Sequence, residues 1–217
     1  MWDNETGNDQ NDGCIRQNLH LTPHSGQSMT DSFTTLWTND RCQLLKQHNQ
    51  EGKNLTILFG GPHTSEPSFR RAAVKAGDII YPVRVKQGVL YIIARLRVSQ
   101  ILALEDYIQL YPEVFSGCEI SQWPSITFEN YLKLHPEMRF LAPTCTDEVV
   151  LGSEGTPIRL DRSVPPDVVE ALRFRSQRRE RGIKHIQDGR IKKVISLQGI
   201  YRLSDRSAGE FARLLHI

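Results

Sequence analysis

The segment that most constrains the fold is Asp78–Val98, where apolar and polar residues alternate along two consecutive runs. The first run reads DIIYPVRV and the second VLYIIARLRV, and the short sequence KQG at 86–88 separates them. Alternation with a period of two residues on both sides of a glycine-containing turn predicts a β-hairpin. We expect its second strand to span about ten residues. Pro82 indicates an edge or a bulge in its first strand.

Further strands are expected where β-branched and aromatic residues cluster between turn residues. These segments are LTILF at 55–59, RFLAP at 139–143, TDEVVLG at 146–152, PIRL at 157–160 and VISLQGIYRLS at 194–204. The sequence therefore predicts strands at intervals throughout the chain beyond residue 50.

Helices are expected from capping residues and from apolar residues at helical spacing. The expected helices are one through 41–50 capped by Thr38 or Asn39, a short one at about 67–75, the segments LALEDYIQLYP and ITFENYLKLHP, one capped by Ser163 with Pro165 and Pro166 in its first turn, and a C-terminal helix with Ser207 and Glu210 as a capping box. Strands and helices thus alternate irregularly, which is typical of an α+β protein.

The entry into the hairpin resembles a known family. The sequence AGDIIY at 76–81 is similar to the Gly-Asp, apolar, aromatic entry of PUA-like domains of the ASCH and EVE type, and the resemblance covers Leu55–Val98. ASCH proteins also carry a Gly-x-Lys-x-x-Glu-x-Arg pattern near the first strand, where this chain has GGPHTSEPSFRR instead. The resemblance implies a small mixed barrel that binds RNA or unusual bases, usually without catalysis. We therefore expect an α+β fold with a mixed β-barrel (PUA-like) core and peripheral helices.

The chain is expected to form one compact body after a disordered start. Residues 1–30 are rich in Asn, Asp, Gln, Ser, Thr and Gly, and such a segment buries too little apolar surface to offset its ordering entropy. Translation from Met29 instead of Met1 would explain this boundary. Within 31–217 no long linker separates the PUA-like candidate at 31–110 from an extension at 111–217, so we expect the two parts to pack together.

Composition excludes several classes of protein. The formal net charge is only +2, so any electrostatic site must be local, and no apolar run is long enough to span a membrane. The N-terminus lacks the basic start and apolar centre of a secretory signal. Cys14, Cys42, Cys118 and Cys145 are scattered without metal-ligand spacing. We expect a soluble cytoplasmic protein with free thiols, no cofactor, no metal and no membrane partner.

The hairpin carries the first candidate binding surface. Arg84, Arg95 and Arg97 can share a face with Tyr91, and arginines beside an aromatic ring on an open sheet suit phosphate contact and base stacking. The alternative is a solvated strand face whose charges prevent association at an edge.

The second candidate surface is the basic segment Arg173–Lys193, in which nine Lys or Arg residues face only two acidic residues, a local charge of +7. We take Arg178 and Arg179 as its candidate contacts to nucleic acid. A solvated loop or a site for an acidic protein partner would explain the same residues.

A pocket near the hairpin entry is a third candidate. His63 lies in the Gly-Pro loop, and Arg70, Asp78 and Tyr81 follow it. No HExxH, GxSxG, GxGxxG or phosphate-loop motif is present, so no catalytic residue is assigned.

The sequence favours a non-catalytic module that contacts nucleic acid, RNA or DNA, or a modified base or nucleotide through the basic, aromatic face. Two alternatives remain open. One is an immunity-type inhibitor that binds an acidic protein partner, and the other is an enzyme acting on a nucleotide or an amide.

Overall fold

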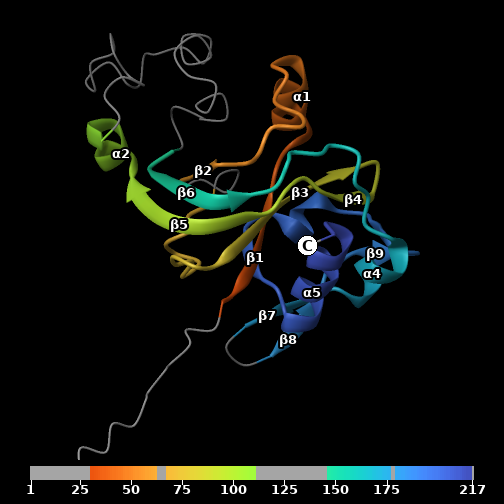
Figure 1. Cartoon of the computed structure of the whole chain (residues 1–217). Helices are drawn as coiled ribbons and strands as arrows, with labels where there is room; N and C mark the ends of the chain where they lie inside the picture. Colours follow the sequence, from red (N-terminus) through yellow and green to blue (C-terminus); the bar gives the residue numbers. More distant parts are fainter. Residues whose placement is uncertain (1–29, 63–66, 111–145, 177–178, 217) are drawn as a thin grey trace, which may run out of the picture.

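The computed structural model describes residues 30–62, 67–110, 146–176 and 179–216. Figure 1 shows a large curved sheet with helices below it and one helix projecting above. The strands are β1 (Ser32–Leu36), β2 (Ile57–Gly60), β3 (Ile79–Lys86), β4 (Val89–Ile92), β5 (Leu96–Ala103), β6 (Glu148–Gly155), β7 (Arg173–Arg175), β8 (Glu180–Gly182), β9 (Ile186–Gln187), β10 (Arg190–Ile191) and β11 (Ile200–Arg202). The helices are α1 (Asn39–Gln47), α2 (Leu104–Leu110), α4 (Pro166–Ala171), the 3₁₀ helix η4 (Val194–Leu197) and α5 (Asp205–Leu214). The chain is therefore an α+β protein, as expected.

One mixed sheet organises the molecule. Seven strands run in the order β11-β1-β3-β5-β6-β2, with β4 paired to β3 off this path. Only β1 and β3 are parallel, and the other pairs are antiparallel. Among the described residues this path ends at β11 on one side and at β2 on the other. The closed barrel stays a prediction.

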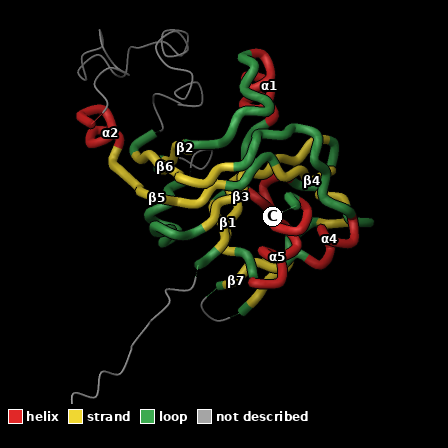
Figure 2. Tube along the Cα trace, in the orientation of Figure 1, coloured by secondary structure: helices red, strands yellow, loops and turns green. Residues whose placement is uncertain are grey.

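A hydrophobic core lies on each face of the sheet. Along β3, Ile79 and Tyr81 belong to one core and Ile80 to the other, because successive strand residues point to opposite faces. Helix α5 covers the first of these faces, where the ring of Phe211 meets Tyr81 edge-on with centroids 5.4 Å apart. Figure 2 shows α4 and α5 together on this side of the sheet. Both cores draw residues from before and after residue 110.

The predicted hairpin is present, but its second strand is shorter than expected. Gln87 and Gly88 form the turn with positive φ angles of 52° and 80°, as a two-residue hairpin requires. β4 ends at Ile92, and a separate strand, β5, begins at Leu96, where it pairs with the start of β3 and with β6. The prediction of one strand of about ten residues is wrong, because the consecutive residues Ile93 and Ala94 are both fully buried in the opposite core and interrupt the alternation.

The segment at 67–75 is a turn and not the predicted helix. Its backbone N–H groups at Phe69 and Arg70 donate to the side chain of Glu148, a long-range partner that the local sequence does not reveal. Ala73 has a φ of 59°, which a helix excludes.

Helix ends follow the predictions only in part. The Thr38 hydroxyl caps α1 as expected, accepting from the Arg41 N–H at 3.2 Å. Ser204 caps α5, three residues before the predicted Ser207. Ser163 caps nothing, since it forms a β-bridge to Tyr91 and α4 starts at Pro166. No described helix is long and apolar enough to cross a membrane.

Expected strands also differ in extent. LTILF and TDEVVLG overlap β2 and β6, which continue beyond them to Gly60 and Gly155, whereas PIRL forms only an isolated bridge from Pro157 to Asn54. VISLQGIYRLS divides at Gly199 into η4 and β11, because Gly199 has a φ of 128°. The expected disordered start, the RFLAP strand and the ITFENYLKLHP helix lie outside the described residues.

Candidate nucleic-acid interface

A cavity of about 810 Å³ opens beside β11, the edge strand of the large sheet. We call it the basic cavity. Its volume lies in the range of small-ligand sites, about 300–1,000 Å³. Its walls come from β1, the turn at 71–73, the β7–β8 ribbon, the loop at 184–185, η4 and β11. It is lined by Phe33, Arg71, Ala72, Ala73, Phe174, Arg175, Ser176, Arg181, Gly182, Lys184, His185, Ile195, Ser196, Ile200, Tyr201 and Arg202.

The charge of this lining has one sign. Among the residues that the structure describes, five Lys or Arg side chains contribute to it and no Asp or Glu does. Arg202 pairs with Asp31 at 3.4 Å, and Arg175 pairs with the exposed Asp205 at 3.6 Å. Arg71, Arg181 and Lys184 form no ion pair with any residue that the structure describes. These three exposed cations are thus available to an anionic ligand.

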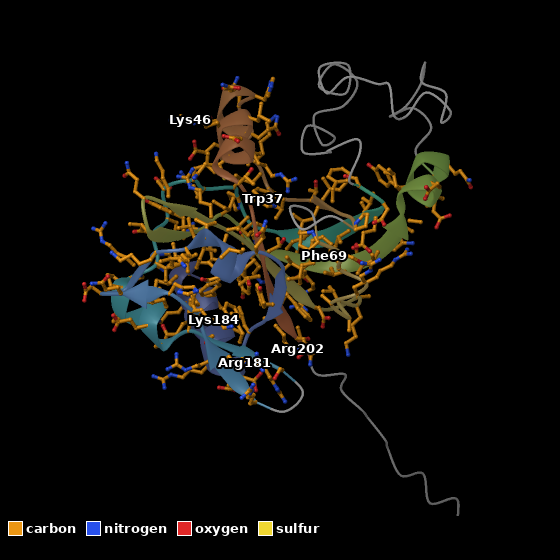
Figure 3. All side chains as sticks on the ribbon, turned by 180° about the vertical axis from the view of Figure 1, so that it is seen from behind. Trp37, Lys46, Phe69, Arg181, Lys184 and Arg202 are labelled. Atoms are coloured by element: carbon orange, nitrogen blue, oxygen red, sulfur yellow. The ribbon has the colours of Figure 1, made fainter. Side chains whose placement is uncertain are left out.

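Figure 3 labels three cations of the basic cavity, Arg181, Lys184 and Arg202. They lie in the same part of the molecule, whereas Lys46 of α1 lies at the opposite end. Because the net charge of the chain is only +2, acidic residues elsewhere in the chain offset the positive charge of this cavity.

Aromatic rings form part of the cavity wall. The rings of Phe174 and Tyr201 pack at a centroid distance of 5.2 Å, tilted by 38°. The Tyr201 hydroxyl donates to the Gln198 carbonyl at 2.8 Å, which fixes the direction of the ring. A Cβ at Gly199 would lie 3.4 Å from this ring, so glycine permits the close approach of the backbone. Tyr201 is half-buried, and its ring thus lines the cavity in an orientation fixed by these contacts.

Strand pairing brings these residues together. β11 pairs with β1 so that Arg202 stands opposite Phe33. The β7–β8 ribbon is joined to the residue that follows β11 by a bridge between Phe174 and Leu203. Because residues almost 170 positions apart line one cavity, no local sequence pattern could have indicated the complete cavity.

Two buried carboxylates hold the turn that carries Arg71. Glu148 is 3% exposed and accepts hydrogen bonds from the N–H groups of Phe69 and Arg70, the second at 3.4 Å. Burial raises the pKa of Glu148, and these hydrogen bonds oppose that rise. Fully buried Asp78 accepts from the N–H groups of Lys75 at 2.9 Å and Asp31 at 3.0 Å.

The predicted hairpin residues serve contacts within the protein. The Arg84 guanidinium lies 4.9 Å from the Tyr91 ring centroid, and its Nη2 donates to the Leu160 carbonyl. Arg97 pairs with Glu154 at 3.0 Å and donates to the Gly77 carbonyl at 3.2 Å.

Arg95 does not share the contact between Arg84 and Tyr91. It hydrogen-bonds to the Tyr81 hydroxyl, on the other side of the sheet. Burial nevertheless raises the pKa of Tyr81.

Arg84 and Tyr91 line a second cavity of about 520 Å³ beneath α1. Its charges are mixed, since Lys46 and Lys86 face Glu51 and Asp161. Cys42 is fully buried in its wall, and this burial raises the thiol pKa.

The expected pocket residues do not meet in the described structure. Arg70 contacts Glu148 at 3.9 Å, whereas Asp78 and Tyr81 are buried and hydrogen-bonded. His63 and Arg178 lie outside the described residues. Arg179 is exposed at the start of the β8 side of the ribbon, next to the basic cavity but not in its lining.

Sequence reasoning found part of the basic cavity. Arg175, Arg181 and Lys184 belong to the basic segment that the charge count singled out. Arg71, Arg202 and the aromatic wall were missed, because the local sequence does not show which of these residues the strands bring to one cavity. In the described part of the chain, no group of three His, Cys, Asp or Glu residues is arranged to hold a metal ion.

Comparison with known proteins gives few matches. No family model and no curated protein matches the sequence. Among solved structures, ASCH from Zymomonas mobilis is similar with 11% identity and a TM-score of 0.40, covering 84% of this chain and 94% of that one. A serine-to-alanine mutant of the same protein is similar with 9% identity and a TM-score of 0.40, covering 84% and 95%.

Proposed function

We propose that this chain is a binding module for single-stranded nucleic acid or for a nucleotide, and that the ligand occupies the basic cavity. The single observation that carries the proposal is that Arg71, Arg181 and Lys184, which form no ion pair with a described residue, line the same cavity as the packed rings of Phe174 and Tyr201. A nucleotide joins a phosphate to a planar base, so it satisfies both kinds of group at once.

The cations fit phosphate. Arginine presents a planar fork of donors that matches phosphate oxygens, and lysine adds a mobile positive charge. Among the described residues, no Asp or Glu lines this cavity, and the nearby Asp31 and Asp205 are each paired with a lining arginine.

The aromatic wall fits a base. Stacking of a base on an aromatic side chain contributes roughly 1–3 kcal/mol and tolerates any sequence, because every base has a π-face. The Tyr201 ring is already oriented by its bond to Gln198, so little ordering entropy is lost when a base stacks on it.

The basic cavity is preferred to the hairpin face as the ligand site. The hairpin arginines Arg84 and Arg97 are occupied by a carbonyl, a ring and a carboxylate of the protein itself. Contact of the ligand with Arg84, Tyr91, Arg95, Arg97, Arg178 or Arg179 stays a prediction that the same binding assay can examine.

The test is a fluorescence-anisotropy titration of the full chain with short mixed-sequence RNA and DNA single strands. If three phosphates are neutralised, affinity should fall about 20-fold between about 50 and about 200 mM salt. Arg181→Ala and Lys184→Ala should each weaken binding, and Lys53→Ala, an exposed lysine outside the cavity lining, should not.

Absence of binding at low salt would overturn the proposal. Binding that is insensitive to salt, or that weakens equally in Lys53→Ala and Arg181→Ala, would place the ligand elsewhere. A stoichiometric acidic protein that copurifies and competes with the oligonucleotide would favour the protein-partner alternative.

A further inference from the structure

We infer that Glu148 is a positioning residue that sets ligand affinity by holding Arg71 at the mouth of the basic cavity; this inference rests on the function proposed above. Glu148 lies on β6 and does not line the cavity. Its effect must therefore pass through the turn that it binds.

A continuous set of hydrogen bonds joins Glu148 to Arg71. The carboxylate accepts from the Phe69 and Arg70 N–H groups and from the Ser68 hydroxyl. The oxygen of that hydroxyl in turn accepts from the Arg71 N–H at 3.1 Å. Glu148 is thus one side chain away from the backbone of Arg71.

The turn itself needs an external support. It closes through Ala73 N–H to the Arg70 carbonyl at 3.0 Å and Val74 N–H to the Phe69 carbonyl at 3.1 Å. Ala73 has a φ of 59°, a left-handed conformation that costs a residue with a side chain roughly 1–2 kcal/mol. Such a conformation persists where the surroundings determine it, and Glu148 is the group that binds the first turn residues.

The site around Glu148 is built for a carboxylate. A Cβ at Gly60 would lie 2.8 Å from its Oε1 and 2.7 Å from the Phe69 ring, so the space is filled. Two charged side chains act on the Glu148 carboxylate. The Arg70 Nε lies 3.9 Å from its Oε2, and the neighbouring Asp147 carries a like charge. Both carboxylate oxygens accept hydrogen bonds, and a glutamine would offer only one oxygen and a competing NH₂ group.

The turn forms one part of the cavity wall. Arg71, Ala72 and Ala73 are its contribution to the lining. Arg71 is exposed and forms no ion pair with a described residue, so the backbone of the turn sets the point from which its side chain extends. Release of the turn would remove one cation from the ligand without altering the others.

The test is a double-mutant cycle with Glu148→Gln and Arg71→Ala, read out by titration of a short mixed-sequence single-stranded RNA. Each single change should weaken binding about tenfold, the effect of losing one charged hydrogen bond. The double variant should bind no more weakly than Arg71→Ala alone, because Glu148 acts through that side chain. Glu154→Gln, on the same strand but exposed, is the control that leaves affinity unchanged.

Hydrogen exchange of the ligand-free protein tests directly whether Glu148 holds the turn at 69–74. Amides of residues 69–74 should exchange faster in Glu148→Gln than in the unmodified chain, and amides of β3 should not. This measurement can be made even if the chain binds no nucleic acid. It therefore distinguishes failure of the proposed function from failure of Glu148 to hold the turn.

Additive losses in the double variant, or unchanged exchange at 69–74, would overturn the inference. If Glu148→Gln does not fold, Ser68→Ala removes the intermediate hydroxyl and leaves the buried carboxylate in place. It should then weaken RNA binding and show the same non-additivity with Arg71→Ala. Additivity of Ser68→Ala with Arg71→Ala would also contradict the role of the turn.

Discussion

The guanidinium of Arg202 lies 5.6 Å from the ring centroid of Phe33, across the pair formed by β11 and β1. The same guanidinium is 3.4 Å from Asp31, which precedes β1. Ring and carboxylate thus fix one cation in the wall of the basic cavity. Arg202 therefore has two contacts that restrict its position, whereas Arg181 and Lys184 form no ion pair with a described residue.

Two replacements of Arg202 distinguish the contribution of its positive charge to binding from the contribution of its planar guanidinium group. Arg202→Ala should weaken RNA binding at low salt and reduce the slope of log K against log salt by about 0.7, the share of one phosphate on a single strand. Arg202→Lys should keep the slope but bind more weakly, because an ammonium neither forks nor stacks as guanidinium does. Anisotropy titrations over a salt series measure both. An unchanged slope in Arg202→Ala would show that this cation does not meet a phosphate.

Tyr201 should contribute through its ring and little through its hydroxyl. Tyr201→Ala removes the stacking surface and should cost roughly 1–3 kcal/mol of binding free energy. Tyr201→Phe loses only the bond to the Gln198 carbonyl and should bind within a few-fold of the unmodified chain. Titration with RNA measures both variants, and thermal unfolding confirms that each is folded. Equal losses in the two variants would argue against stacking.

The buried carboxyl of Glu148 should make stability depend on pH in weakly acidic solution. Burial raises its pKa above the usual value of 4.5, so the folded chain holds this proton more tightly than the unfolded chain. The stabilisation from protonation is complete below the unfolded pKa and is lost as pH rises through the folded pKa. The unfolding free energy of the native chain relative to Glu148→Gln should therefore decrease over that interval. Urea unfolding at several pH values checks the sign, and an increase with pH would contradict it.

Gly60 should not tolerate a side chain. A Cβ there would meet the Phe69 ring at 2.7 Å and the Glu148 carboxylate at 2.8 Å. Gly60→Ala should destabilise the fold by about 1–3 kcal/mol, the usual cost of overpacking. Gly209→Ala is the matched control, because Gly209 lies in α5 with no atom within 4 Å of its Cβ position. That change should stabilise the chain by roughly 0.5–1 kcal/mol. Urea unfolding compares the two, and equal effects would contradict the packing argument.

Local features were predicted where local physics decides them. The turn at Gln87–Gly88 needs positive φ angles that the residues readily adopt, and the Thr38 cap needs only a hydroxyl three residues before an N–H. The turn at 67–75 was mistaken for a helix, because its backbone partner is Glu148, almost eighty positions away. Similarly, the second hairpin strand ended early because buried Ile93 and Ala94 belong to the opposite core.

The sequence by itself determined the α+β class, the hairpin, the first helix, the C-terminal helix and the concentration of positive charge after Arg173. Each of these depends on neighbours within a few residues, through turn geometry, capping or apolar spacing. Only the tertiary structure decided the basic cavity. Its wall joins Phe33 to Arg202 through strand register, and the carboxylate of Glu148 holds the Arg71 turn beside them. Register and burial are set by the packing of the whole sheet, so a site assembled from distant strands has no signature in any one segment.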